Sequence, residues 1–200
     1  MAHSDLEYEY NPGWSDQFKD NGFVVLRNII PAPTLAMLND YYWFLMRNQQ
    51  LARFPTSLGK YGDLLSESLL IRYQKLFEEI TGHTLYPTFS FMRLYYHNSL
   101  LAKHRDRVGS EFAVSIAIDY DTEDIWPLHL KDLNKKEHAL KLDRGDMVLY
   151  RGCDLVHWRE AYPGRNSLHL FLFYVDSEGP MKHLKYDTRK KLGDPHPSSG

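Results

Sequence analysis

The chain has 200 residues, with 24 lysines and arginines against 26 aspartates and glutamates and a formal charge of −2 at neutral pH. This length predicts one domain with a sizeable core, and the balanced charge and lack of a long apolar run argue against nucleic-acid and membrane partners. The single Cys153 excludes an internal disulfide and, with an acidic N-terminus that lacks an apolar leader, predicts a cytoplasmic protein.

The first part of the chain is expected to be a helical flank over residues 14–82. Apolar residues recur with the helical period at 34–50 and again at 64–81, which predicts two amphipathic helices. The other predicted elements are short: a helix over 14–20, a buried strand over 23–26, and a loop over 52–63 that contains a proline and two glycines.

From residue 85 onward the pattern changes to strands. Residues 112–119 alternate between large apolar and small or polar side chains, which is the two-residue period of a strand. Further short strands are expected at 126–130, 139–142, 147–150 and 167–175. Many short strands after two helices predict a mainly β sandwich or barrel core over 85–175, within a single domain that spans residues 1–200. The polar segment 176–200 is expected to be a loose tail.

A histidine and a carboxylate lie two residues apart at His104-Arg105-Asp106. In an extended segment such residues point to the same side, so both can reach one metal ion. His157 is the candidate for a third ligand, and two histidines with one carboxylate form the ligand set of non-haem Fe(II) oxygenases. The spacing alone is weak evidence, because His3 and Asp5 repeat it in a polar N-terminal run.

The ordered set of motifs resembles the Fe(II)/2-oxoglutarate-dependent oxygenases, in the prolyl-hydroxylase-like or phytanoyl-CoA-hydroxylase-like branch. In chain order these motifs are residues 21–31, Tyr95-Tyr96, His104-Arg105-Asp106, residues 112–120, Trp126-Pro127-Leu128, residues 145–150, His157 and Arg165-Asn166-Ser167. The resemblance covers roughly residues 17–175. It implies a double-stranded β-helix (a jelly-roll, cupin-like core), Fe(II) in the mouth of the barrel, and 2-oxoglutarate and O2 as co-substrates.

The same resemblance directs attention to a cation for the distal carboxylate of 2-oxoglutarate. Arg165 follows His157 across a Pro163-Gly164 turn, and an arginine fork suits a carboxylate. Ser167, two residues on, is expected to point the same way and donate its hydroxyl. Tyr95 or Tyr96 is a further co-substrate candidate, and strand alternation allows only one of them to face inward.

The remaining candidates and alternatives concern the substrate and the reaction class. Arg107, Arg159 and Trp158 are candidates for substrate contacts, and Cys153 is interpreted as packing. Because Asp106 is present, hydroxylation of an unactivated C–H bond is expected, on a small molecule or a peptide. Two alternatives stay open: a cupin-type metal enzyme without 2-oxoglutarate, and a non-catalytic β-barrel binding protein.

Overall fold

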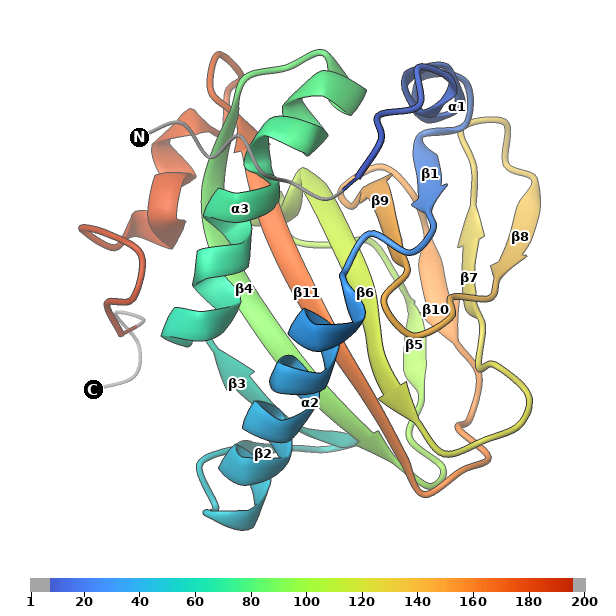
Figure 1. Ribbon diagram of the computed structural model, residues 1–200. Helices are drawn as coiled ribbons and strands as arrows, with labels where there is room; N and C mark the ends of the chain where they lie inside the picture. Colours follow the sequence, from blue (N-terminus) through green and yellow to red (C-terminus); the bar gives the residue numbers. More distant parts are fainter. Residues whose placement is uncertain (1–7, 196–200) are drawn as a thin grey trace.

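The computed structural model describes residues 8–195, which form two packed antiparallel β-sheets with helices on the outer face of the larger one (Figure 1). The helices are α1 (Gly13–Asn21), α2 (Ala32–Arg47) and α3 (Leu64–Thr81), and short 3-10 segments occupy Val108–Ser110 and Lys182–Thr188. The His3/Asp5 pair lies outside the described residues. None of the helices over residues 8–195 combines the length and apolar character that crossing a membrane requires.

The larger sheet has seven strands in the order β1-β9-β6-β11-β4-β3-β2, and the smaller has four in the order β5-β10-β7-β8. The seven strands are Phe23–Leu26 (β1), Ala52–Phe54 (β2), Ser57–Tyr61 (β3), Leu85–Tyr96 (β4), Phe112–Tyr120 (β6), Met147–Arg151 (β9) and Asn166–Asp176 (β11). The four strands are Leu101–His104 (β5), Leu128–Lys131 (β7), Glu137–Leu140 (β8) and His157–Arg159 (β10). The central neighbours β9, β6, β11 and β4, and the pair β5–β10, are not consecutive in the sequence, as in a double-stranded β-helix, so the predicted jelly-roll core is confirmed.

Strand alternation divides the larger sheet into two faces with different partners. On β6, Val114, Ile116 and Ile118 pack against the helices, whereas Ala113 and Ala117 face the smaller sheet. The core under the helices is therefore dense and aliphatic. The face toward the smaller sheet carries small side chains at its centre, and this leaves room for a cavity between the sheets.

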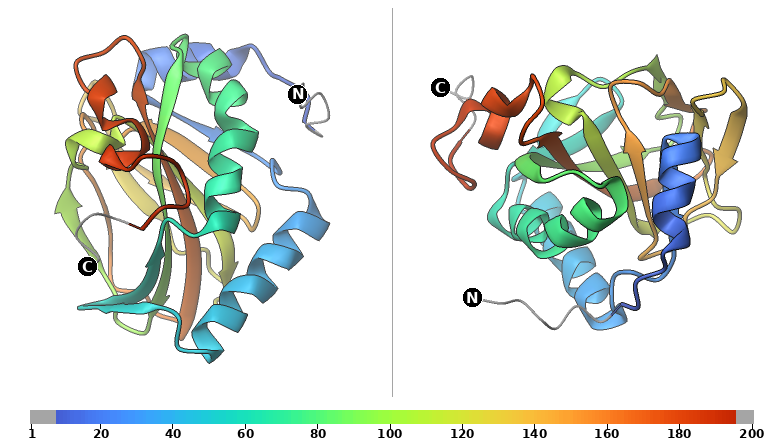
Figure 2. Two further views of the ribbon diagram at one scale, coloured as in Figure 1. Left: turned by 90° about the vertical axis from the view of Figure 1, so that its left-hand side faces the viewer. Right: turned by 90° about the horizontal axis from the view of Figure 1, so that it is seen from above.

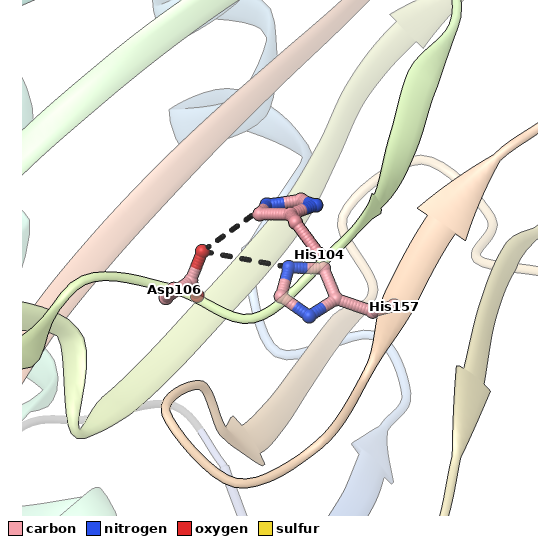
Figure 3. Close-up of side chains that lie close together, drawn as sticks. All are labelled: His104, Asp106 and His157. Carbon is pink, nitrogen blue, oxygen red and sulfur yellow. Dashed lines mark ion pairs between the residues drawn. The ribbon is translucent and has the colours of Figure 1, made fainter.

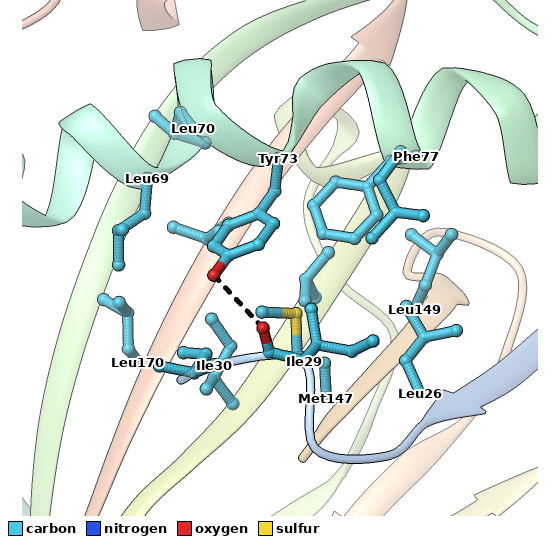
Figure 4. Close-up of a cluster of buried hydrophobic side chains, with 14 of the residues drawn as sticks. Leu26, Ile29, Ile30, Leu69, Leu70, Tyr73, Phe77, Met147, Leu149 and Leu170 are labelled. Atoms are coloured by element: carbon cyan, nitrogen blue, oxygen red, sulfur yellow. Dashed lines mark hydrogen bonds between the residues drawn. The ribbon is translucent and has the colours of Figure 1, made fainter. Parts of the chain in front are cut away.

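Helix α3 covers the outer face of the larger sheet (Figure 4). It begins after Asp63, whose carboxylate accepts a hydrogen bond from the Ser66 N–H, and it ends at Gly82, which adopts a left-handed φ of 73°. Tyr73 and Phe77 project from it into the core, and each is almost fully buried. Burial of side chains of this size contributes about 1.5–3 kcal/mol each, so this helix anchors the sheet that carries the site.

Two predictions about boundaries were wrong, and one was confirmed. The loop predicted over 52–63 contains the hairpin of β2 and β3, which extends the edge of the larger sheet beside β4. The buried strand predicted over 23–26 is confirmed as β1, which pairs with β9 at the opposite edge. The predicted loose tail is packed as far as it is described: Asp187 and Arg189 are buried, and the segment lies against β4 (Figure 2).

Candidate metal centre

Two strands of the smaller sheet bring the predicted ligands together. His104 ends β5, His157 begins β10, and the two are direct partners in the antiparallel register. Asp106 follows β5 in an extended segment, and its backbone N–H donates to the Gly152 carbonyl at 2.9 Å. That hydrogen bond ties the Asp106 segment to the loop between β9 and β10 and places its carboxylate beside both imidazoles (Figure 3).

The three side chains present their lone pairs to a common point. Asp106 Oδ1 lies 3.4 Å from His104 Nε2 and 3.5 Å from His157 Nε2. Each histidine Nδ1 lies against a backbone carbonyl, Ala102 O at 2.8 Å and Leu155 O at 3.0 Å. A carbonyl only accepts, so Nδ1 carries the proton of the neutral ring and the Nε2 lone pair is left for a ligand.

This donor set fits a divalent transition metal. One atom from each of His104, Asp106 and His157 lies within 4.8 Å of the others. The carbonyl acceptors behind both imidazoles fix the ring orientations, as such outer partners do in metal sites. The remaining directions around the common point open to a cavity, which is the arrangement of a facial triad with free coordination positions.

The charges and hydrogen bonds around Asp106 favour its ionised form. Burial raises the pKa of Asp106, but the facing His104 and His157 outweigh it, so the pKa of this carboxyl is lowered. The hydrogen bond to Asp106 is the main cause that raises the pKa of His104. Tyr150 donates from its hydroxyl to Asp106 Oδ2 at 3.4 Å, and burial keeps its pKa well above the ordinary value.

Gly152 is a site residue that the sequence interpretation missed. A Cβ at this position would lie 2.6 Å from Asp106 Oδ2 and would also meet the backbone oxygen of Ser110. Because neither neighbour can yield without moving the carboxylate, only glycine lets the chain pass behind Asp106. The glycine before Cys153 was the available signal, but its role depends on a contact between segments that are far apart in the sequence.

The three candidate metal ligands face a cavity of about 900 Å³ between the two sheets. Its walls come mainly from β4, β11, β3 and the smaller sheet. The lining residues are Phe54, Tyr61, Phe89, Phe91, Arg93, Tyr95, Leu101, His104, Arg105, Asp106, Arg107, Ser110, Leu128, Tyr150, His157, Phe171 and Phe173. This volume is that of a small-molecule site, and most of the lining is aromatic or aliphatic.

Partnerless polar groups gather near one end of the cavity, where β4, β10 and β11 meet. The hydroxyl of Tyr95 and Nε of Arg159 are buried and have no hydrogen-bond partner among the described residues. Arg159 donates from Nη1 to Trp126 O at 2.8 Å, and burial lowers its pKa to about 10. His169 lies beside it and accepts or donates a hydrogen bond with Ser167 Oγ at 2.9 Å.

The co-substrate candidates from the sequence fall in different places. Tyr95 is fully buried and lines the cavity, whereas Tyr96 is exposed and its hydroxyl donates to Pro55 O. Tyr95 is therefore the tyrosine that faces inward. Ser167 is buried with its hydroxyl on His169. Arg165 is exposed and outside the cavity lining, because Asp121 accepts its backbone N–H and holds the turn before β11. The side chain of Arg165 therefore does not line the cavity, contrary to the expectation from the sequence.

Two substrate candidates have partners of their own. Arg107 lines the cavity, but its guanidinium forms a two-pronged ion pair with Asp187, with N–O distances of 2.8 and 2.7 Å. Trp158 points away from His157 and stacks on His129, so it does not line the cavity.

The interpretation of Cys153 as a packing residue agrees with its surroundings. Its thiol donates to Arg107 O at 3.3 Å, and burial raises its pKa to about 11. A thiol of this kind stays protonated at neutral pH and is a poor metal ligand.

Comparisons with known proteins bear on the fold. No protein-family model and no curated protein matches the sequence. Among solved structures, a prolyl-4-hydroxylase from Pseudomonas putida aligns with a TM-score of 0.69 at 14% identity, covering 82% of this chain and 98% of that one. The chain has the fold of the 2-oxoglutarate/Fe(II) oxygenases.

Two other solved structures with this fold come from nogalamycin biosynthesis. The non-haem α-ketoglutarate-dependent carbocyclase SnoK aligns with a TM-score of 0.74 at 12% identity, over 93% of both chains. The epimerase SnoN, in complex with Fe3+, α-ketoglutarate and nogalamycin RO, aligns with a TM-score of 0.72 at 13% identity, over 94% of this chain and 90% of that one. Proteins with the oxygenase fold thus catalyse more than one type of reaction.

Proposed function

We propose that this chain is a non-haem Fe(II)- and 2-oxoglutarate-dependent dioxygenase that hydroxylates a C–H bond of a small molecule or a peptide. The observation that carries the proposal is the convergence of His104, Asp106 and His157 on one point that faces the cavity. In the proposed reaction one oxygen atom of O2 converts C–H to C–OH. The other enters succinate as 2-oxoglutarate loses CO2.

Different residues of the chain would bind the metal and the co-substrate. His104, Asp106 and His157 would hold Fe(II), which supplies the oxidising chemistry when bound. Tyr150 donates to Asp106 Oδ2, whereas Oδ1 faces the two imidazoles, and this hydrogen bond orients the carboxylate.

For the distal carboxylate of 2-oxoglutarate, Arg159 and Tyr95 replace Arg165 as the best candidates. Arg159 is fully buried, and its described contacts include no carboxylate partner. A buried cation without an anion is unfavourable by several kcal/mol, so a ligand carboxylate beside it would be strongly stabilised. The hydroxyl of Tyr95, which has no hydrogen-bond partner among the described residues, would donate a hydrogen bond to this carboxylate. Ser167 is hydrogen-bonded to His169, which lies beside Arg159.

The proposal is tested by loading the purified chain anaerobically with Fe(II) and titrating 2-oxoglutarate. The expected result is a metal-to-ligand charge-transfer band that saturates at one equivalent. Admission of O2 should then release succinate in an iron-dependent manner. A cupin-type enzyme would bind iron without this band, and a non-catalytic barrel would bind neither, so either result would contradict the proposal. With a substrate in hand, 18O2 labelling separates hydroxylation from the ring closure or epimerisation known for this fold.

A further inference from the structure

One wall of the cavity is a continuous run of aromatic rings. Tyr61 stacks on Phe89 with centroids 5.4 Å apart, Phe89 on Phe173 at 4.3 Å, and Phe173 on Phe171 at 6.4 Å. The interplanar angles are 16°, 25° and 14°, so the four rings are nearly parallel. They come from β3, β4 and β11, which are adjacent in the larger sheet, and all four line the cavity, so one side of it is aromatic.

Among the described residues, one arginine that lines this cavity has no hydrogen-bond or ion-pair partner for its guanidinium. Arg107 is neutralised by Asp187, and Arg105 donates from Nε to Asp154 O at 2.9 Å. Arg93, on β4, has a buried Nε without a hydrogen-bond partner, and within residues 8–195 no ion pair or hydrogen bond involves its guanidinium. It is held instead by rings, lying 5.2 Å from the centroid of Phe91 and 5.6 Å from that of Tyr95.

We propose that the prime substrate is an aromatic carboxylate, whose ring lies along the aromatic wall and whose carboxylate is gripped by Arg93. This inference rests on the proposed oxygenase function. Aromatic walls favour planar apolar ligands, and a small number of polar groups fix their orientation. A guanidinium already desolvated on one edge and flanked by rings pairs with a carboxylate through two parallel hydrogen bonds.

The positions of the two available cations assign Arg93 to the substrate rather than to 2-oxoglutarate. Arg159 is fully buried and is not among the residues that line the cavity, so it is not offered to a substrate that enters from solvent. Arg93 is half-buried and lines the open cavity, where a substrate enters from solvent. Arg93 and His104 line the same cavity, so a ligand held by Arg93 shares that cavity with the candidate metal ligands.

The test measures binding by isothermal titration calorimetry to the anaerobic Fe(II)/2-oxoglutarate protein and, separately, to the metal-free chain. The probes are 3-phenylpropionate, indole-3-acetate and 1-naphthylacetate, each paired with its neutral primary amide. At least one acid should bind more tightly than its amide. Arg93→Met should weaken that acid by ~10- to 100-fold and leave the amide unchanged. Arg93→Lys should retain part of the preference because it keeps the charge.

The matched control is Arg53→Met, which removes an exposed arginine from the neighbouring β2 outside the cavity. It should leave every probe unchanged. The proposal is overturned if no acid binds better than its amide, or if the preference survives in Arg93→Met. It is also overturned if Arg93→Met abolishes the 2-oxoglutarate charge-transfer band, because Arg93 would then hold the co-substrate. If 2-oxoglutarate fails to bind wild type while the acid preference depends on Arg93, the oxygenase proposal fails and this one stands.

Should Arg93→Met not fold, as judged by circular dichroism, Arg93→Gln and Arg93→Lys carry the same comparison. Glutamine keeps the hydrogen-bonding capacity without the charge. A loss of acid preference in Arg93→Gln that is restored in Arg93→Lys assigns the effect to charge. Equal preference in both variants excludes Arg93 as the carboxylate partner.

Discussion

His104 and His157 are direct cross-strand partners in the pair β5–β10, and their ring centroids lie 4.3 Å apart. Adjacent strands bring the backbones of opposed residues to about 5 Å, so two imidazoles on one face lie side by side. The carboxylate of Asp106 completes the group from the segment that follows β5. The convergence of the three side chains thus depends on the pairing of β5 with β10 and on the backbone hydrogen bond from Asp106 to Gly152.

The first prediction concerns the ligands themselves. His157→Ala removes a buried donor from the group, so iron bound after anaerobic loading and desalting should fall from about one equivalent to a small fraction. Metal analysis gives the stoichiometry. His97→Ala, which removes an exposed histidine from the turn after β4, should keep full iron content. Equal iron in both variants would contradict the assigned ligand set.

Gly152 provides a test of how Asp106 is positioned. Gly152→Ala places a methyl group where Asp106 Oδ2 and the Ser110 carbonyl already lie, so the carboxylate must shift. Misplacement of an outer partner typically costs 10- to 100-fold in metal affinity, and we expect a loss of about that size. The measurement is competition with a metal-binding dye.

A second glycine serves as the comparison for Gly152. Gly82→Ala introduces strain at a positive φ of 73° with nothing within 4 Å of the new methyl, so it should cost stability and leave metal affinity unchanged. If both variants lost metal affinity to the same extent, the effect would be a general loss of folding.

Co-substrate binding separates Arg165, which the sequence favoured for this role, from Arg159, which the structure favours. Tyr95→Phe removes only the partnerless hydroxyl and should weaken 2-oxoglutarate binding by ~10-fold, and Arg159→Met should weaken it further. Arg165→Met should leave the dissociation constant unchanged because Arg165 is exposed on the turn before β11. The charge-transfer titration reports all three. A large effect of Arg165→Met alone would restore the expectation from the sequence.

The C-terminal segment is tied to α3 by a buried ion pair. Arg189 Nη2 lies 2.6 Å from Glu67 Oε1, and the two side chains are 1% and 2% exposed. Arg189→Met leaves the Glu67 carboxylate buried without its cation, so the free energy of unfolding should fall by about 3–5 kcal/mol at neutral pH. Urea denaturation measures it. Lys75→Met, at an exposed pair on the same helix, should cost less than about 1 kcal/mol.

The same variant should acquire a distinctive pH dependence. Burial already raises the pKa of Glu67, and Arg189 partly offsets that effect. Without the cation the folded-state pKa rises further above the unfolded value, so the folded state binds more protons and stability falls as pH rises through that window. The loss of stability relative to wild type should therefore be smaller at about pH 5 than at about pH 7. A loss independent of pH would point to packing instead.

The sequence by itself determined the elements whose signal is local. The two-residue period of Phe112–Tyr120 and the helical period of Leu64–Thr81 depend on one buried face each, and both appear where they were expected. The i, i+2 spacing of His104 and Asp106 needed only an extended backbone. These features follow from short-range geometry, which any fold that buries those faces preserves.

Only the tertiary structure decided which side chains share the cavity. The sequence favoured Arg165 for the co-substrate, but the carboxylate of Asp121 holds the turn at Arg165 outside, while β10 carries Arg159 into the core. Gly152 lies against Asp106 and Arg93 lies against Phe54, so both gain their roles from contacts between segments that are distant along the chain. Such contacts depend on strand order and register, which arise from packing of the whole domain and leave no local pattern.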